Sequence, residues 1–535
     1  MRTYWMDNFG CRATQADAAA IEAQLAESGL SRSGSASAAD LIVLNTCTVT
    51  AAADAQAREA IRRVHRENPA ARVLATGCYA QRAPEELAAL PGVAWVVGNS
   101  HQKWIGALCK NTGETPAVQD GRSGDNFVPL GALSGTQRGP ARDAGAVRDS
   151  FVPLGVLAGA RPMALADSPK ILTGDIFEVE DVLVTRAAGS EGPSPPRRAG
   201  SVGAGRTRPV LKIQDGCNNR CAYCVIPFVR GRSRSLAPER VVQEVCALAA
   251  AGAREVVLSG INLGAYGRDL TPHVGLRDLL ARLVDETPVE RIRLSSIEPM
   301  DLTLDLVDLV ARHSGQARSG RIAPHFHVPL QSGSDRMLAA MHRWYRAAHY
   351  AERILLAAER LPAAGIGADV ICGFPGETGE DHRRTVELIE RLPFSYLHVF
   401  SYSSRPGTRA AAMAEIVPDG VIRERARELR ALSAKKAAAF RAAQNGALHR
   451  VLTLGRTGTD VRGQAWTTEG TAVPCPYEKR SRTGSDGEPW TAALTGNYVN
   501  VRVAGRWPRN TWLNVRLSAA GEVLRGEVIA GAIPA

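Results

Sequence analysis

Cysteine is scarce in this chain, and long apolar runs are missing from it. Ten cysteines in 535 residues are too few for a scaffold held by disulfides, so we expect metal ligands, catalytic thiols or core fillers. No stretch runs for about 18 apolar residues without a charge, so no membrane span is expected. The first residues, MRTYWMDNFGCRATQ, lack the apolar core of a signal peptide. We therefore expect a cytoplasmic protein with no membrane partner.

Negative charge is the scarcer sign. Asp and Glu total 54 against 65 Lys and Arg, which gives a formal net charge of +11. A surplus of this size suits a polyanionic partner, although an Arg-rich composition alone would also produce it. The hydrophobic content of 45% is enough to bury several cores, and the length predicts two to four domains.

Residues 1–106 are expected to form an alternating α/β unit. Apolar runs near Tyr4 and in LIVLNTC, RVLATGC and AWVVGN indicate strands, and helices are predicted over about 15–28 and 52–66. This alternation predicts a parallel sheet with helices outside it.

Three cysteines occupy matching places in this unit. Cys11, Cys47 and Cys78 each follow a predicted strand. Because the carboxyl ends of parallel strands meet at one edge of a sheet, we expect these thiols to converge although they are distant in sequence.

Residues 107–207 lose this pattern and are rich in Gly, Pro, Ser, Ala and Arg. Two related segments, NFVPLGALSG at 126–135 and SFVPLGVLAG at 150–159, are too few copies for a solenoid. Only ILTGDIFEVEDVLV is predicted to be ordered, as a hairpin. We expect the region to be an insertion or linker.

Residues 208–445 contain six strand-like runs, most of them followed by a helical pattern: VLKIQ, EVVLSG, RIRLSS, HFHVPL, IGADVICGF and YLHVFSY. Repeated βα units predict a parallel partial barrel with its chemistry at the carboxyl ends of the strands. Residues 446–535 alternate apolar and polar residues and predict a small all-β module. The predicted fold class is α/β, with a parallel amino-terminal domain, a (βα)6 partial barrel and a carboxyl-terminal β module.

A second group of cysteines has a compact spacing. Cys217, Cys221 and Cys224 form a Cys-x3-Cys-x2-Cys loop after the strand VLKIQ. A closed zinc site needs four ligands, whereas three soft thiolates suit a four-iron cluster that keeps one open iron for a substrate or cofactor. A zinc knuckle completed by a distant residue, or a set of reduced structural thiols, remains the alternative.

Several motifs together resemble a known family. The cysteine loop, with Tyr223 before its last cysteine, looks like the radical S-adenosylmethionine signature. KIQDGCNNRCAYCVIPFVRGRSRS, LSGINLGAYG, LSSIEP, HFHVPLQSGSDRML, DVICGFPGET, NFGCRATQAD, LNTCTVT and TGCYAQ are similar to the methylthiotransferases. These motifs are most similar to those of the branch that methylthiolates carbon 2 of N6-threonylcarbamoyladenosine at position 37 of tRNA.

The resemblance implies two 4Fe-4S clusters and S-adenosylmethionine as cofactors. One cluster would bind Cys11, Cys47 and Cys78, and the other would bind the Cys217 loop. The radical partial barrel would span 208–445, and a TRAM-like RNA-binding β-barrel would span 446–535. The implied partners are tRNA and a reductant protein of flavodoxin or ferredoxin type, and the expected oligomeric state is a monomer.

Five residues are expected to contact the cofactor, and no side chain is assigned as catalytic. They are Tyr223 of the signature, Gln331 and Ser332 of PLQSG, Asp369, and Gly373 of GFPGE. PLQSG is also typical of a structural turn. Asp369 is an acid in an apolar strand, and such a charge normally requires a partner.

Other polar residues have competing interpretations. Arg230, Arg232 and Arg234 alternate, so they suit either phosphate contacts or a solvated basic face. His325 and His327 favour a packed or hydrogen-bonded role over a metal. The four remaining cysteines are interpreted as core or incidental thiols: Cys109, Cys246, Cys372 and Cys475. Thr14 stands where the family motif has Asn, so we expect altered support around the amino-terminal cluster.

Three rival functions follow from the same residues. The same machinery would modify isopentenyladenosine in tRNA, or an aspartate of a ribosomal protein. The third, from a different class, is a non-catalytic RNA-binding protein whose cysteines hold zinc.

Overall fold

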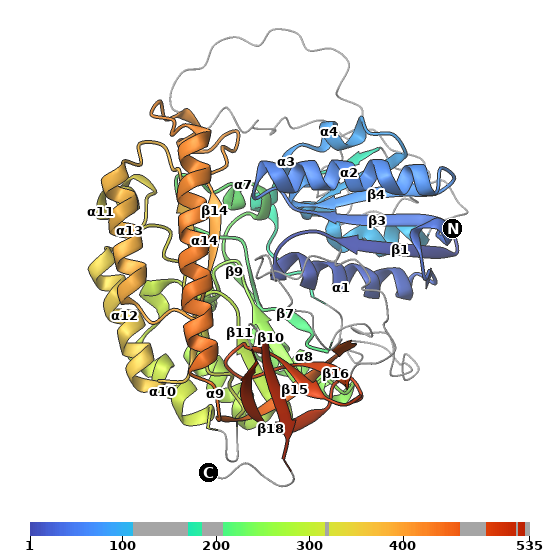
Figure 1. Ribbon diagram of the computed structural model, residues 1–535. Helices are drawn as coiled ribbons and strands as arrows, with labels where there is room; N and C mark the ends of the chain where they lie inside the picture. The colour runs from blue at the N-terminus through green and yellow to red at the C-terminus, as the bar shows by residue number, and fades with distance from the viewer. Residues whose placement is uncertain (111–169, 185–206, 316–319, 461–487, 521–522, 530–535) are drawn as a thin grey trace.

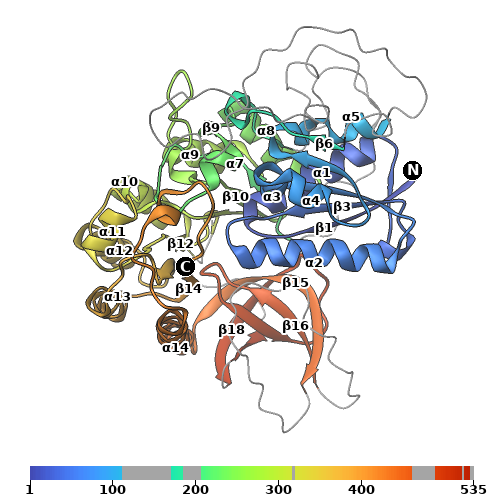
Figure 2. The same cartoon turned by 90° about the horizontal axis from the view of Figure 1, so that it is seen from above.

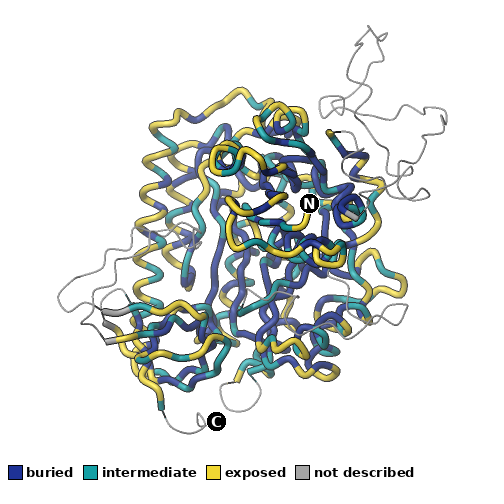
Figure 3. The backbone as a smooth tube through the Cα atoms, turned by 90° about the vertical axis from the view of Figure 1, so that its right-hand side faces the viewer, coloured by how far each residue is buried: buried dark blue, intermediate teal, exposed yellow. Residues whose placement is uncertain are grey.

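The computed structural model describes residues 1–110, 170–184, 207–315, 320–460, 488–520 and 523–529. They form a parallel sheet with its helices, a larger curved βα unit and a small β-barrel (Figure 1). Figure 3 shows buried backbone running through the sheets, with exposed residues concentrated on the outer helices. Among the described residues, no helix has the length and apolar character needed to cross a membrane.

The amino-terminal sheet is parallel throughout. Its strand order is β2-β1-β3-β4-β5-β6. The strands are β1 (Thr3–Asn8), β2 (Ser31–Arg32), β3 (Leu41–Thr46), β4 (Arg72–Gly77), β5 (Val93–Gly98) and β6 (Ile171–Leu172). The predicted parallel sheet is confirmed, and β1, β3 and β4 are adjacent.

Helices cover both faces of this sheet because β3 is apolar on both sides. Leu41 and Val43 pack with Ile21 of α1, whereas Ile42 packs on the opposite face with Ile61 of α2. The Thr50 side chain caps α2 by accepting a hydrogen bond from the Ala53 amide. The helices are α1 (Arg12–Glu27), α2 (Ala51–Glu67), α3 (Cys78–Arg82), α4 (Pro84–Ala88) and α5 (Ile105–Lys110).

One predicted hairpin is wrong. In ILTGDIFEVEDVLV, residues 171–172 form β6, which pairs parallel with β5, and a 3-10 turn follows at Ile176–Glu178. The apolar pair at the start of this segment therefore extends the amino-terminal sheet at its edge. The two related segments at 126–135 and 150–159 lie outside the described residues, as does Cys475.

The curved unit contains six parallel strands with helices on its outer side (Figures 1 and 2). Two three-stranded sheets, β7-β10-β11 and β12-β13-β14, are joined by the bridge between Ser296 and His327. The strands are β7 (Val210–Lys212), β10 (Glu255–Ser259), β11 (Arg291–Leu294), β12 (His325–His327), β13 (Gly365–Cys372) and β14 (Tyr396–Ser401). The predicted partial barrel is confirmed.

The helices of this unit follow its strands. The short β8 (Gln214–Asp215) and β9 (Arg234–Ser235) pair around the cysteine loop. The helices are α7 (Ile226–Arg230), α8 (Pro238–Ala250), α9 (Leu276–Glu286), α10 (Leu304–His313), α11 (Asp335–Ala340), α12 (Ala347–Arg360), α13 (Gly379–Arg391) and α14 (Asp419–Ala442).

The carboxyl-terminal strands close into a barrel in the order β15-β16-β17-β19-β18, which confirms the small all-β module. They are β15 (Leu448–Asp460), β16 (Glu488–Leu494), β17 (Asn500–Ala504), β18 (Trp512–Ala520) and β19 (Val523–Val528). Val451, Val501 and Val515 fill the interior. Residues 461–487 of this module lie outside the described residues.

This barrel docks against the amino ends of the partial-barrel strands. The Arg293 guanidinium donates to the Gly496 carbonyl at 2.8 Å, and the Asn497 amide donates to the Ala363 carbonyl at 2.9 Å. Tyr498 also accepts a hydrogen bond from Arg12 of the amino-terminal domain at 3.3 Å. The amino-terminal domain, the partial barrel and the small barrel therefore meet around Tyr498. Because the small barrel docks at the amino ends of the partial-barrel strands, it leaves their carboxyl ends for the site.

Candidate functional site

The amino-terminal cysteines lie at the carboxyl ends of three adjacent strands. Cys11 follows β1, Cys47 follows β3 and Cys78 begins α3 directly after β4. Burial, together with the neighbouring thiols of Cys11 and Cys78, raises the pKa of Cys47 to about 12. Thr46 and Gly77, the residues before Cys47 and Cys78, pair directly, and Asn8 at the end of β1 pairs with Asn45, so the three loops that carry the thiols lie side by side as predicted.

Two glycines make this close approach possible. Gly10 (φ +108°) precedes Cys11, and a Cβ on Gly10 would lie 2.9 Å from the Cys47 sulfur. Gly77 (φ +99°) precedes Cys78, and a Cβ there would lie 2.3 Å from the Thr46 carbonyl oxygen. Only glycine suits both the backbone angle and the space.

Thr14 supports the Cys11 loop from within α1. Its buried hydroxyl lies 2.8 Å from the Cys11 carbonyl oxygen and 3.2 Å from that of Phe9. Its own carbonyl accepts a hydrogen bond from the Asn45 side chain at 2.8 Å. Threonine thus ties the loop to the helix and to β3.

The second trio lies in the loop after β8. The Cys217 amide donates to the Gly231 carbonyl at 3.1 Å, and the Ala222 amide donates to the Met341 carbonyl at 2.9 Å. Burial raises the pKa of Cys217 to about 11, and burial with the nearby Cys221 thiol raises that of Cys224. The loop is therefore held between the residue that follows α7 and the residue that follows α11.

The spacing of both trios fits a cluster better than a single zinc ion. In the described part of the chain, His327, Asp369 and His398 are the one group of three or more possible ligands whose ligand atoms all lie within 4.8 Å of one another. The three sulfur atoms of a cysteine trio are therefore not all this close together. Zinc holds thiolates at about 2.3 Å in a tetrahedron, which places the sulfurs about 3.8 Å apart. A four-iron cluster binds its thiolates at separate corners and so sets them wider.

The short helix α7 connects the two trios. It begins two residues after Cys224, and Val225 and Val229 pack against Cys78 of the other trio. The Asn99 side chain donates to the Val229 carbonyl at 2.7 Å and to the Cys78 sulfur at 3.5 Å. The segment that follows one cysteine loop therefore contacts a cysteine of the other.

Arg230, the last residue of α7, is central to a buried group of charges. Its guanidinium donates to the Cys78 sulfur at 3.3 Å, to Asp17 of α1 at 2.7 Å and to Asp215 at 3.0 Å. Lys212 pairs with the same two carboxylates. Burial opposes ionisation of Asp215, yet the neighbouring Lys212 and Arg230 hold its pKa well below the usual value.

This finding corrects the interpretation of the alternating arginines. Arg230 is 2% exposed and Arg234 is also buried, donating to the carbonyls of Arg230 and Asp181. Neither is available to a phosphate or to a solvated face. They tie the amino-terminal domain and the 170–184 segment to the partial barrel.

A second arginine serves the other trio. The Arg343 guanidinium, directly after α11, donates to the Cys221 sulfur at 3.3 Å and forms an ion pair with Glu298. Burial raises the pKa of Glu298, and Arg343 opposes that rise. Each trio therefore has one sulfur that accepts a hydrogen bond from a buried guanidinium.

The residues predicted to contact the cofactor are held by contacts within the partial barrel. Tyr223 packs edge-on against Phe374 at 6.5 Å between ring centroids, next to Gly373. Gln331 has φ +65° and its amide donates to the Asp369 carbonyl. The Ser332 hydroxyl contacts that of Thr385 at 3.3 Å and accepts from the Ser334 amide, which is the role of a structural turn.

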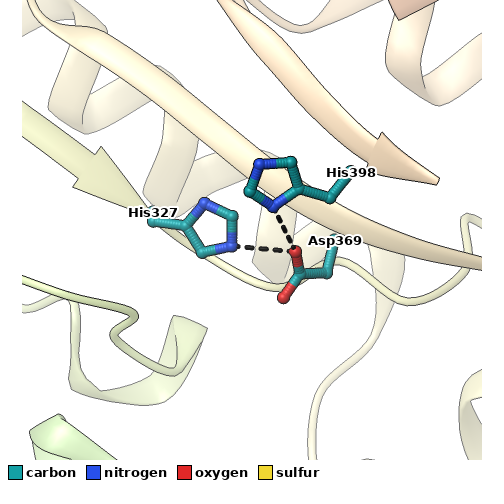
Figure 4. A group of neighbouring side chains, drawn as sticks. All are labelled: His327, Asp369 and His398. Carbon is teal, nitrogen blue, oxygen red and sulfur yellow. Dashed lines mark hydrogen bonds and ion pairs between the residues drawn. The ribbon is translucent and has the colours of Figure 1, made fainter. Parts of the chain in front are cut away.

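Asp369 has partners that the sequence pattern did not identify (Figure 4). Its Oδ1 accepts hydrogen bonds from His327 Nε2 at 2.9 Å and from His398 Nδ1 at 3.1 Å. The Tyr396 hydroxyl lies 3.1 Å from His327 Nδ1 and 2.9 Å from His325 Nε2. The hydrogen-bonded role predicted for the two histidines is confirmed.

The residues that sequence reasoning missed are Asp17, His398 and Arg343. Asp17 occupies the buried face of a helix, and a buried acid signals a partner. His398 falls in register with Asp369 across neighbouring strands, and this register is not specified by the alternation within either strand. Arg343 carries no motif signal. Cys109 and Cys372 are buried in cores, as predicted, and Cys246 is half-buried on α8.

Comparisons with known proteins agree with this arrangement. Residues 3–98 match the family described as "Uncharacterized protein family UPF0004", and residues 211–389 match the "Radical SAM superfamily". The chain is 34% identical to "Threonylcarbamoyladenosine tRNA methylthiotransferase MtaB" of Aquifex aeolicus (strain VF5), over 81% of this chain and 88% of that protein. The chain belongs to the radical S-adenosylmethionine methylthiotransferase family.

Further relatives define its place in that family. The Bacillus subtilis (strain 168) protein also named MtaB is 34% identical over 81% of this chain and 80% of its own length. A "tRNA-2-methylthio-N(6)-dimethylallyladenosine synthase" of Carboxydothermus hydrogenoformans is 30% identical over 86% and 89%. This methylthiotransferase falls in the branch represented by the MtaB proteins, and S-adenosylmethionine and two 4Fe-4S clusters are its cofactors.

Proposed function

We propose that this methylthiotransferase inserts a methylthio group at carbon 2 of N6-threonylcarbamoyladenosine at position 37 of tRNA. One observation carries the proposal. Two cysteine trios on two different domains approach one another through α7, as insertion of sulfur beside a radical centre requires. Two relatives named for this activity are 34% identical over most of the chain.

In the proposal, one cluster is held by Cys11, Cys47 and Cys78 and the other by the loop of Cys217, Cys221 and Cys224. S-adenosylmethionine on an open iron supplies a radical strong enough for an aromatic C–H bond, which no side-chain base can deprotonate. The resemblance to the family supports the proposal that Tyr223, Gln331 and Gly373 contact the cofactor.

The protein's own contribution is positioning and exclusion of water. The buried charges of Arg230, Asp17 and Asp215 fix the angle between the two domains. Arg230 donates a hydrogen bond to the Cys78 sulfur and Arg343 to the Cys221 sulfur, so each guanidinium orients one ligand of a trio. Val225, which precedes α7, and Val229 within it are buried and pack against Cys78, which is itself buried.

The carboxyl-terminal barrel is the proposed tRNA-binding module. Exposed arginines on its strands and loops suit phosphate contacts: Arg506, Arg509, Arg516 and Arg525. The net charge of +11 is consistent with a polyanionic substrate. We also propose a cytoplasmic monomer that receives electrons from a flavodoxin- or ferredoxin-type protein.

Isopentenyladenosine is the second candidate substrate, since relatives named for dimethylallyladenosine cover most of the chain. Mass spectrometry of tRNA nucleosides from a deletion strain decides between them. We expect loss of the methylthio derivative of threonylcarbamoyladenosine, with the unmethylthiolated nucleoside accumulating. Loss of the isopentenyl derivative instead, or unchanged tRNA with an altered ribosomal protein, would refute the proposal.

The residue assignment has its own test. Cys221→Ala is expected to abolish S-adenosylmethionine cleavage and to leave the amino-terminal cluster in place, visible as about half of the iron. Cys246→Ala, which removes a thiol on α8 outside both trios, is the matched control. Cleavage that persists in Cys221→Ala would contradict the assignment.

A further inference from the structure

Three aromatic side chains follow one face of β14 and become more exposed along it. Tyr396, His398 and Phe400 alternate along the strand, so they point to the same side. Tyr396 is enclosed by His325 and His327 and lies over Gly367. The His398 side chain is 26% exposed, and Phe400 is 42% exposed. The Phe400 ring packs edge-on against His398, at 6.4 Å between ring centroids, and its exposed part lies at the carboxyl end of a barrel strand, where it can contact a ligand.

The hydrogen bonds of this face fix the orientation of His398. Burial opposes ionisation of Asp369, yet His327 and His398 hold its pKa below the usual value. His398 Nδ1 lies 3.1 Å from Asp369 Oδ1 (Figure 4). Because an ionised carboxylate can only accept a hydrogen bond, we assign the donated proton to Nδ1. Among the described residues, His398 Nε2 has no hydrogen-bond partner.

The rest of the network is hydrogen-bonded internally except for the buried Nδ1 of His325. His327 uses both ring nitrogens, one with Asp369 and one with Tyr396. The Tyr396 hydroxyl also binds His325. Two polar atoms consequently remain available on this face: Nε2 of His398 and the outer carboxylate oxygen of Asp369, whose side chain is 23% exposed.

We propose that β14 reads the substrate, with Phe400 stacking on the extruded adenine and His398 binding the polar N6 substituent. The proposal rests on the proposed function, because it assigns the amino-acid part of that nucleoside a site. Residues two apart on a strand are separated by about 6.6 Å. This is the scale of the distance from an adenine ring to a carboxylate or hydroxyl carried on its N6 group. Bases acted on by enzymes are stacked on apolar or aromatic side chains.

In this proposal, the same two polar atoms distinguish threonylcarbamoyladenosine from isopentenyladenosine. A threonylcarbamoyl group offers N–H and O–H donors to the two acceptor atoms on this face, His398 Nε2 and the outer oxygen of Asp369. An isoprenoid group would cover both atoms and leave them without hydrogen bonds, which costs free energy that the apolar contact does not return. His398 is therefore the specificity-determining residue, and Asp369 is the positioning residue that holds it.

The experiment measures binding and not turnover. Reconstituted enzyme is titrated anaerobically, without S-adenosylmethionine, against fluorescent anticodon stem-loops that carry threonylcarbamoyladenosine, isopentenyladenosine or adenosine at position 37. The variants are His398→Phe, His398→Gln and Phe400→Ala. His349→Gln, at a histidine on the outer helix α12, is the control. Iron content and the cluster absorption band confirm that each variant is assembled.

We expect the wild-type protein to prefer the threonylcarbamoyl stem-loop. His398→Phe should weaken that complex about ten- to a hundredfold and leave the adenosine stem-loop unchanged, with partial recovery in His398→Gln. Phe400→Ala should weaken all three complexes, since stacking does not depend on the substituent.

Three results would overturn the inference. The first is a His398→Phe protein that keeps the wild-type preference. The second is a metal ion, other than the iron of the clusters, that is present in the wild-type protein and absent from an Asp369→Asn variant. The ligand atoms of His327, Asp369 and His398 lie within 4.8 Å of one another, which is close enough to hold such an ion. The third is a wild-type preference for another stem-loop, which refutes the proposed function itself and is seen before any variant is made.

Discussion

Replacing Arg230 by Gln removes a cation from the buried charges between two domains. In the native protein, Asp17 and Asp215 face Arg230 and Lys212, with Arg234 further away at 3.6 Å from Asp215. The variant leaves Lys212 as the close partner of two carboxylates. Asp17 belongs to α1, whereas the other four belong to the partial barrel, so the cost falls on the interface between the domains.

The expected cost is about 3–5 kcal/mol, because removing one partner of a buried ion pair leaves an uncompensated charge. If the loss appears as easier separation of the domains, amide exchange in α1 accelerates about a hundred- to a few-thousandfold. Cys78 also loses its guanidinium donor, so the amino-terminal cluster should be released more readily.

Hydrogen exchange followed by mass spectrometry of the reconstituted protein measures this effect on peptides from α1. Arg232→Gln is the matched control, since Arg232 is exposed two residues further on. The double variant Asp17→Asn with Arg230→Gln restores the charge balance and should lose less than Arg230→Gln alone. Equal exchange in the Arg230 and Arg232 variants, or simple addition of the two single effects, would refute the reasoning.

Further predictions concern the cysteine loops and the small barrel. In an anaerobic iron assay, the Arg343→Gln protein should contain less iron in the partial-barrel cluster, because Glu298 loses its cation. Arg346→Gln, at an exposed arginine, should keep the wild-type iron content. Gly77→Ala should lower iron in the amino-terminal cluster. Gly29→Ala has a similar φ of +86° but open space around it, so it should leave that iron unchanged. Burial, with Arg291 nearby, lowers the pKa of His449 to about 4, so the unfolded chain binds the extra proton below about pH 6.5. The free energy of unfolding should then fall by about 3 kcal/mol between pH 7 and pH 4, and urea titration should show a smaller fall for His449→Gln. Equal falls would contradict the assignment.

The architecture could be predicted from the sequence because the patterns that specify it are local or periodic. The alternation of strands and helices predicts parallel sheets, and the position of a cysteine directly after a strand predicts the edge where it lies. Cys11, Cys47 and Cys78 could be grouped by this rule alone. The same rule failed at 171–172, because a strand of two residues carries too little pattern to reveal its partner.

The contacts between domains were beyond the sequence. Asp17 and Arg230 are 213 residues apart, and no periodicity connects them. Arg230 was interpreted with its exposed neighbour Arg232 because both carry the same charge in the same short motif. Asp369 was correctly expected to need a partner, but the identity of that partner depended on the register between β12, β13 and β14.

The central claim is that each cysteine trio holds its own 4Fe-4S cluster. Iron and acid-labile sulfide per chain, measured after anaerobic reconstitution, test it most directly. The wild-type protein should contain about eight of each. Alanine at Cys11, Cys47 and Cys78 should leave about four, and so should alanine at Cys217, Cys221 and Cys224. Zinc without sulfide in the wild-type protein, or a triple variant that loses no iron, would contradict the claim.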